Sequence, residues 1–235
     1  MTEPTARRRP GGRSARRAAR SEAASEAAPY LTRSMSPVEV VSEEGLAAIE
    51  ENAETILEEV GIDFREYPRA LELLDAAGAE VDGERVRFPR GMCREVIATS
   101  APATYTHHAR NPARSVQVGG NATVFAPAYG PPFVHDLDQG RRYATIEDFN
   151  NFVKLAYQSP NLHLSGGTVC EPVDIPVSKR HLDMIYAHLR YSDKPFMGSV
   201  TAAERAQDTV DMAKLVFGDE FVESNTVVTS LINAS

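Results

Sequence analysis

Three side chains that could attract a small cation lie at predicted strand ends and turns. A carboxylate attracts positive charge directly, and an aromatic ring attracts it through its electron-rich face. Glu171 stands before Pro172 at the predicted end of a strand, where the alternative is a solvated loop acid or a helix-capping partner. Tyr129, in the segment Ala-Tyr-Gly-Pro-Pro, could form an aromatic cage with Phe133, although such a tyrosine also anchors tight turns.

Two polar side chains follow the later predicted strands. Ser199 falls at the end of the second strand of a predicted parallel series, and Asn233 falls at the end of the third. In barrels of alternating strands and helices, active sites lie at these carboxyl ends. Both residues are therefore candidates for binding a ligand, with an ordinary strand-end hydrogen bond as the alternative for Asn233.

The histidines do not indicate a metal site. His181 and His188 are seven residues apart on one predicted helix, two turns apart, which is too far to share a metal without a third ligand. We expect them to have surface or helix-capping roles. His107, His108 and His135 lie in a β-rich region and match no zinc-binding spacing such as HExxH. The sequence therefore predicts no metal in the protein.

The cysteines and glycine pairs favour structural roles. Cys93 and Cys170 have no CxxC partner, which argues against a disulfide framework and is typical of a reducing compartment, so we expect a cytoplasmic protein. Cys93 shares an apolar helix face and should be a packed core thiol. The pairs 119–120 and 166–167 lack the spacing of phosphate-binding loops, and the second pair falls inside a predicted strand.

Composition separates an arginine-rich arm from an acidic body. The 235 residues carry a net charge of -8, although seven arginines lie between Arg7 and Arg20. We expect residues 1–36 to form a disordered tail, with contact to nucleic acid or an acidic partner as the alternative. No apolar run approaches the roughly 20 residues that a membrane span needs, so no membrane association is expected.

Residues 37–120 are predicted to form a helical and β-hairpin region. Ser42 should cap a helix that ends at Gly61, and Pro68 should open a second helix that ends at Gly78. Asp82-Gly83 predicts a hairpin turn, and Pro89 opens a third helix. Short strand candidates then follow at residues 104–106, 115–118, 123–126 and 133–135.

Residues 121–235 alternate between helical and strand patterns. Helices are predicted at residues 145–158, 176–191 and 202–217, and strands at 162–169, 195–200 and 226–232. This alternation predicts an α/β fold with parallel strands. A (β/α)8 TIM-type barrel typically takes about 250 residues, so the sequence indicates either an incomplete barrel, which makes the chain a fragment, or a small open sheet.

Four segments resemble one known family. They are Val134-His-Asp-Leu-Asp-Gln-Gly-Arg-Arg-Tyr-Ala-Thr-Ile-Glu-Asp-Phe, Ser159-Pro-Asn-Leu-His, Pro172-Val-Asp-Ile-Pro and Asp193-Lys-Pro-Phe. Their order and spacing, together with the Arg/Ala-rich arm, are similar to the N-terminal half of the trimethylamine methyltransferase family. Gln139 departs from the pattern, because the family commonly has threonine there.

The resemblance implies a fold, a reaction and a partner. It implies a closed TIM-type barrel that moves a methyl group from trimethylamine, or from a quaternary amine such as glycine betaine, to the Co(I) corrinoid of a separate corrinoid protein. No cofactor would be bound directly, and the five candidate residues would then bind the amine. The full-length protein would be a homo-oligomer in methanogenesis-type one-carbon metabolism, and any pyrrolysine would lie in the second half.

Two other functions stay open at this stage. One is a non-catalytic fragment or adaptor whose basic arm meets an acidic partner, and the other is a TIM-barrel enzyme of different chemistry. We also expect this fragment to be inactive alone and to aggregate or oligomerise, because an incomplete barrel exposes an unpaired strand edge.

Overall fold

The computed structural model describes residues 30–199 and 201–232. Most of the predicted tail, and Asn233, lie outside the described residues. The chain forms two compact units, Met35–Ala103 in one and Met1–Ser34 with Thr104–Ser235 in the other. The sequence placed a boundary at residue 120, whereas the structure groups residues 104–120 with the later elements.

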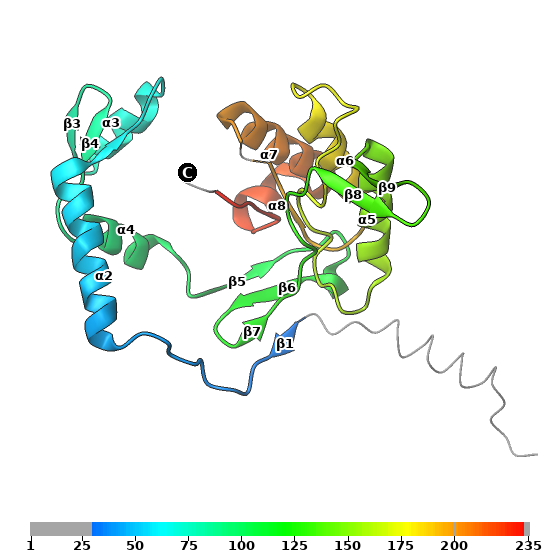
Figure 1. The fold of residues 1–235 in the computed structure, drawn as a ribbon, viewed down its shortest axis with the longest axis horizontal. Helices are drawn as coiled ribbons and strands as arrows, with labels where there is room; N and C mark the ends of the chain where they lie inside the picture. The colour runs from blue at the N-terminus through cyan, green and yellow to red at the C-terminus, as the bar shows by residue number, and fades with distance from the viewer. Residues whose placement is uncertain (1–29, 200, 233–235) are drawn as a thin grey trace, which may run out of the picture. The chain divides into compact units, whose positions relative to one another are not determined.

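The Met35–Ala103 unit combines helices with a small antiparallel sheet (Figure 1). Its helices are α2 (Glu43–Thr55), a π-helical continuation η1 (Ile56–Val60), α3 (Pro68–Ala76) and α4 (Met92–Ser100). Its strands pair in the order β2 (Ile62–Asp63), β4 (Arg85–Arg87), β3 (Glu80–Asp82). The predicted helices and hairpin are therefore present, and Ser42 caps α2 by accepting a hydrogen bond from the Gly45 amide at 3.2 Å.

Two details of this unit correct the sequence predictions. Asp82 pairs with Arg85, so the hairpin turn consists of Gly83 and Glu84 rather than Asp82 and Gly83, and Gly83 takes the positive φ of 63° that the turn requires. Cys93 packs beside the buried Ala79, Val86 and Phe88, but it is only partly buried itself.

The second unit begins with antiparallel strands. A four-stranded sheet has the order β1 (Leu31–Thr32), β7 (Ala122–Thr123), β6 (Val116–Gly119), β5 (Thr104–His107), with the 3-10 helix η2 (Pro112–Arg114) between β5 and β6. A separate hairpin joins β8 (Phe133–Asp136) to β9 (Gly140–Tyr143). Strand β8 matches the strand candidate at residues 133–135, whereas strand β9 was not predicted.

The remaining elements follow the predicted alternation, except that the helix α8 was not predicted. They are α5 (Ile146–Gln158), α6 (Arg180–Tyr191), β10 (Phe196–Met197), α7 (Ala203–Phe217), α8 (Asp219–Ser224) and β11 (Val228–Thr229). Gly166 bridges Phe196 in parallel, and β10 pairs with β11 in parallel. Three successive β segments with helices between them thus lie in chain order, which makes the described residues a mixed α/β fold without a closed barrel.

The first of these β segments is much shorter than predicted. Only Gly166 of residues 162–169 pairs with a neighbour, because its φ of 100° turns the chain out of an extended conformation. A side chain at this position would also be crowded, since a Cβ would lie 2.7 Å from the Val169 side chain.

The core of this unit lies around α5 and α6. Phe149, Val153 and Ala156 form the buried face of α5, and Cys170, Met184 and Ala187 are among the other buried residues. Phe152 and Leu182 remain more exposed, as the outer faces of amphipathic helices do. None of the helices in residues 30–199 and 201–232 combines the length and apolarity needed to cross a membrane.

Candidate functional site

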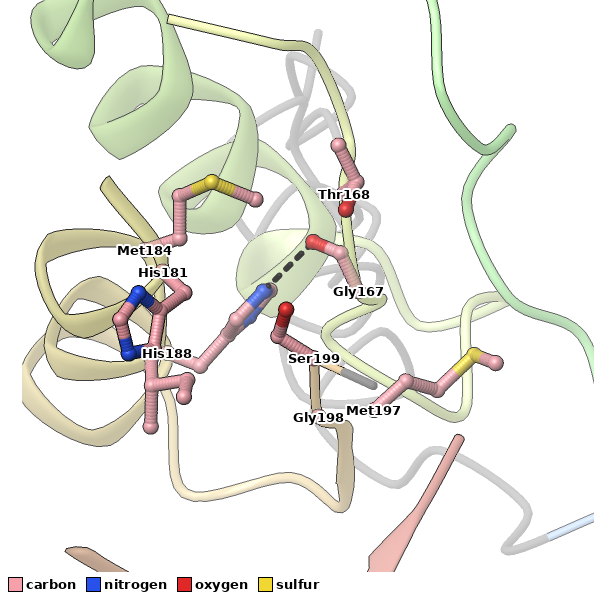
Figure 2. Close-up of a pocket in the computed structure, with 9 residues that line it drawn as sticks. Gly167, Thr168, His181, Met184, His188, Met197, Gly198 and Ser199 are labelled. Carbon is pink, nitrogen blue, oxygen red and sulfur yellow. Dashed lines mark hydrogen bonds between the residues drawn. The ribbon is translucent and has the colours of Figure 1, made fainter. Parts of the chain in front are cut away.

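A small cavity lies at the carboxyl ends of the first two parallel β segments (Figure 2). Its lining residues come from the segment after Gly166, from α6 and from the end of β10, and they are Gly167, Thr168, His181, Met184, Ile185, His188, Met197, Gly198 and Ser199. Its volume of about 10 Å³ has room for about one water molecule. Ligands of α/β folds bind at this end of the strands, so the cavity is the candidate site.

His188 is the buried anchor of the cavity. Its Nε2 lies 2.8 Å from the Gly167 carbonyl oxygen, a hydrogen bond that Figure 2 marks with a dashed line, and its Nδ1 lies 2.9 Å from the Ser165 hydroxyl. Burial lowers the pKa of His188 to about 4, so the ring is neutral near neutral pH. A carbonyl can only accept, so Nε2–H donates to Gly167 and the Ser165 hydroxyl donates to Nδ1. His188 thereby holds the edge of the cavity in place.

His181 lies two turns earlier on α6 and is also buried, with an exposed fraction of 6%. Its Nε2 is 2.7 Å from Asp208 Oδ2 on α7. Its Nδ1 is buried and has no hydrogen-bond partner among the described residues. The predicted surface or capping roles of His181 and His188 are therefore wrong. Both belong to the stripe that Met184 and Ile185 continue at helical spacing, a pattern that indicates a buried face.

Two glycines allow close packing around the cavity. A Cβ on Gly167 would lie 2.7 Å from Tyr129 Cε2 and 3.0 Å from Met197 Cβ. A Cβ on Gly198 would lie 2.3 Å from the Thr209 methyl carbon, so any side chain there would displace α7. The structural role expected for the glycine pair 166–167 is thus close packing of neighbouring side chains against the backbone.

The structure brings one of the predicted residues, Ser199, to this cavity and places a second, Tyr129, beside one of its lining residues. Ser199 lines the cavity. The Thr209 hydroxyl accepts a hydrogen bond from the Ser199 amide at 3.2 Å and lies 3.3 Å from the Ser199 carbonyl oxygen. The Tyr129 ring packs on Gly167 while 43% of the residue stays exposed. A hydrogen bond of 2.6 Å from the Gly130 amide to the Thr168 carbonyl fixes the same turn.

Glu171 and Phe133 have other neighbours. Glu171 forms an ion pair with Arg180 in the first turn of α6, and its amide donates to the Pro131 carbonyl at 2.9 Å. The Phe133 ring contacts Tyr143, and the Arg141 guanidinium carbon lies 3.7 Å from its centre. Phe133 thus already stacks with a cation of its own hairpin. Among the described residues Phe133 stacks with Tyr143 and Arg141 rather than with Tyr129, and the aromatic cage of Phe133 and Tyr129 stays a prediction.

Comparison with known proteins places the chain in a family. The family described as Trimethylamine methyltransferase (MTTB) matches residues 9–235. The chain belongs to this trimethylamine methyltransferase family. It is also 46% identical, over 196 residues, to a glycine betaine methyltransferase of Desulfitobacterium hafniense (strain Y51). That match covers 83% of this chain and 40% of the relative, so the chain spans well under half the length of that relative.

One segment that resembles the trimethylamine methyltransferase family has a clear structural role here. Lys194 of Asp193-Lys-Pro-Phe is buried, and its Nζ donates to the carbonyls of Ala156, Ser159 and Leu162 at 2.7 to 2.8 Å. Burial lowers the pKa of Lys194 to about 8. The lysine ties the last turn of α5 to the start of β10, whose far end forms the candidate site.

The described part of this trimethylamine methyltransferase family member offers hydrogen bonding and apolar contact rather than metal coordination. Within residues 30–199 and 201–232, no three His, Cys, Asp or Glu side chains are grouped to hold a metal ion. Burial raises the pKa of Cys170 to about 12, which keeps the thiol protonated and unreactive.

Proposed function

We propose that the protein to which this chain belongs transfers a methyl group from a methylated amine to the Co(I) corrinoid of a separate protein. The amine is trimethylamine or a quaternary amine such as glycine betaine. The observation that carries the proposal is the 46% identity to a glycine betaine methyltransferase over 83% of the chain. The family match over residues 9–235 supports the same class of reaction.

The reaction needs a donor and a strong nucleophile. The C–N bond breaks with its electron pair left on nitrogen, so trimethylammonium gives dimethylamine and glycine betaine gives dimethylglycine. The electron pair of Co(I) forms the new Co–C bond, which makes the metal formally Co(III). Because the corrinoid carries the difficult chemistry and arrives as a substrate on its own protein, this chain has to bind the amine and orient it.

We also propose that the three parallel β segments are the first strands of a (β/α)8 barrel. The parallel pairing of Gly166 with Phe196 and of β10 with β11, with a helix in each crossover, supports this arrangement. The amine would then bind at the end of the strands where the cavity lies. Tyr129 packs on Gly167 beside this cavity with 43% of the residue exposed, and Glu171 and Ser199 lie on the segments that follow the first two β segments.

Methyl transfer to a corrinoid protein tests the proposal. The full-length protein that contains this chain would be mixed with a corrinoid protein reduced to Co(I), and then with trimethylamine or glycine betaine. We expect the visible spectrum of Co(I) to be replaced by that of methyl-Co(III), and NMR to detect the demethylated amine. No spectral change with either amine, or a change that occurs equally without the protein, would refute the proposal.

Tyr129→Ala and Tyr129→Phe would test the aromatic face. The phenylalanine variant keeps the ring, so it should retain the KM for the amine, whereas the alanine variant should raise KM about tenfold through loss of a cation–π contact. Glu72→Gln is the matched control, because Glu72 is exposed on α3 in the other compact unit. Equal KM values for Tyr129→Ala and Glu72→Gln would show that Tyr129 does not contribute to binding of the amine.

A further inference from the structure

We propose that helix α2 and its continuation η1 form a docking face for a basic amphipathic helix of a partner protein. The face consists of Leu46, Ile49, Ala53, Ile56 and Val60, which we call the α2 seam. The α2 seam lies in the Met35–Ala103 unit, whereas the candidate site lies in the other unit. The inference therefore does not rest on the proposed function.

The five residues of the α2 seam follow the spacing of a coiled coil. They are 3, 4, 3 and 4 residues apart, and apolar residues at this spacing line one side of a helix. The π-helical η1 keeps the chain helical as far as Val60. A stripe of this kind is the surface that one helix buries against another.

The α2 seam is exposed to solvent. Leu46, Ile49, Ile56 and Val60 have exposed fractions of 50%, 60%, 57% and 53%, and Ala53 is exposed as well. Contiguous exposed apolar side chains of this kind mark surfaces that bind another molecule. The α2 seam thus has the spacing of a helix-binding face and the exposure that binding requires.

Contacts on the opposite side hold this helix in its unit and leave the seam open. Helix α4 lies beside α2 (Figure 1), and its neighbour Arg90 forms ion pairs with Glu51 at 3.0 Å and with Glu58 at 2.9 Å. Leu57 packs against the buried cluster of the unit. At 3.6 residues per turn, Glu51 and Glu58 lie nearly opposite the α2 seam. The attachment of the helix therefore does not use the seam.

The charge of the helix favours a basic partner. Seven glutamates and no lysine or arginine lie between Glu43 and Val60, and Glu43, Glu50 and Glu59 flank the α2 seam. Residues at these flanking positions form the ion pairs that decide which helices pair. A second copy of the helix would bring glutamates close to glutamates, whereas lysines and arginines beside an apolar stripe would pair with them.

The same charge argues against nucleic acid and anionic membranes as occupants. Residues 35–103 contain 16 Asp and Glu and 6 Arg, which gives them a net charge of -10. Such a unit repels the phosphate groups of both. A basic helix with apolar residues at the same spacing matches the seam in shape and in charge, as in other complexes where a helix binds an apolar face.

A synthetic helix of three heptads tests the proposal on the full-length protein that contains this chain. The lysine probe carries a fluorophore, leucine at the two seam positions of each heptad and lysine at the two flanking positions. We expect fluorescence anisotropy to show binding with a Kd of about 1 to 100 µM, weakened about tenfold as salt rises from about 0.05 M to about 0.5 M. Two matched probes, one with glutamate in place of lysine and one with serine in place of leucine, should each bind about tenfold or more weakly.

Substitutions on the protein locate the binding face. Ile49→Ser should weaken binding of the lysine probe about tenfold, because it removes an apolar side chain from the middle of the α2 seam. Leu73→Ser on α3 is the matched control and should bind normally, since Leu73 is 61% exposed and Ile49 is 60% exposed. Glu59→Lys should weaken binding, whereas Glu72→Lys, also on α3, should not. Circular dichroism would establish that each variant is folded.

The proposal is overturned if the full-length protein does not bind the lysine probe, or if either matched probe binds as tightly. It is also overturned if a folded Ile49→Ser variant binds the lysine probe unchanged. Sedimentation velocity tests the remaining occupant. A dimer that Ile49→Ser dissociates and Leu73→Ser leaves intact would place a second copy on the α2 seam and would rule out the basic partner.

Discussion

At the scale of single residues, buried polar side chains hold the candidate site in place. Lys194 and His188 are both buried, and both bind backbone carbonyls of segments far away in the sequence. Each carbonyl would lose a partner if the side chain were removed, and the loss of an internal partner is the main cost of such a change. These residues should therefore contribute to stability and to the position of the cavity at once.

Lys194→Met should lower the free energy of unfolding by about 2 to 4 kcal/mol, because it leaves carbonyls at the end of α5 without their shared donor. Methionine preserves much of the side-chain volume, so the change reports mainly on hydrogen bonding. Urea unfolding would measure it, with Lys179→Met as the control, since Lys179 forms an exposed pair worth less than about 1 kcal/mol. Equal losses in both variants would contradict this role of Lys194.

The pH dependence of stability should report on His188. Burial lowers its pKa to about 4 in the folded state, against about 6.5 in an unfolded chain. The unfolded state therefore binds more protons between these values, so stability is full above pH about 6.5 and is lost as the pH falls toward about 4. His107, whose pKa burial also lowers to about 4, should act in the same direction.

Urea unfolding at pH about 7 and about 5.5 would measure this effect, with a loss of about 1 kcal/mol expected for each of His188 and His107. His188→Gln should be less stable at both pH values and should show a smaller loss between them than the wild type. His135→Asn is the control at an exposed position and should behave as the wild type. A His188→Gln variant with the full wild-type pH dependence would show that His188 is not the group responsible.

At the scale of elements, the helices were predictable because their signals are local. Ser42, Pro68 and Thr145 each mark a helix start that the structure confirms. Strand β9 was not predictable, because its Gly-Arg-Arg-Tyr sequence has no apolar alternation. It is held by pairing with β8 and by the ion pairs of Arg142 with Asp136 and Asp148, each six residues away. Gly166 likewise cut a predicted strand short through a positive φ that the sequence pattern does not specify.

The candidate site was partly predictable for the same reason. Ser199 could be placed at a strand end because such ends can be read from a hydrophobic run, and Tyr129 could be placed in a turn because Gly-Pro-Pro follows it. His181 was missed because its role depends on Asp208, which lies on another helix and is 27 residues away. Only the stripe formed with Met184 and Ile185 gave a local signal that this face of α6 is buried.

Helix α5 allows a direct test of a local signal. Thr145 and Asp148 form a capping box, in which the Thr145 hydroxyl lies 3.3 Å from the Asp148 amide and Asp148 Oδ2 lies 2.8 Å from the Thr145 amide. Thr145→Val keeps the shape of the side chain and removes the hydroxyl, so it should cost about 1 kcal/mol in urea unfolding. Thr99→Val should cost less than half of that, because its hydroxyl bonds within an exposed helix. An equal cost at both positions would mean that the cap contributes nothing.

At the scale of the whole molecule, short exposed segments of the chain join the two compact units. Residues 33–42 contain neither helix nor strand, and Met35, Val38 and Val40 have exposed fractions of 75%, 82% and 93%. Residues 101–103 are also exposed and lie at the other boundary between the units. By contrast, the buried cluster around Phe149 and Met184 lies wholly within residues 104–235.

Limited proteolysis should therefore separate the two units before it degrades either of them. Among cuts within residues 30–199, the first made by subtilisin should fall at residues 35–41 and 101–103, because a protease needs several residues of exposed, extended chain. Mass spectrometry would identify them, and a fragment that begins near Thr104 should persist while fragments of residues 35–103 are lost, since that unit has the smaller buried core. Early cleavage within α5 or α6 would contradict this division, because those helices carry the core that holds the candidate site together.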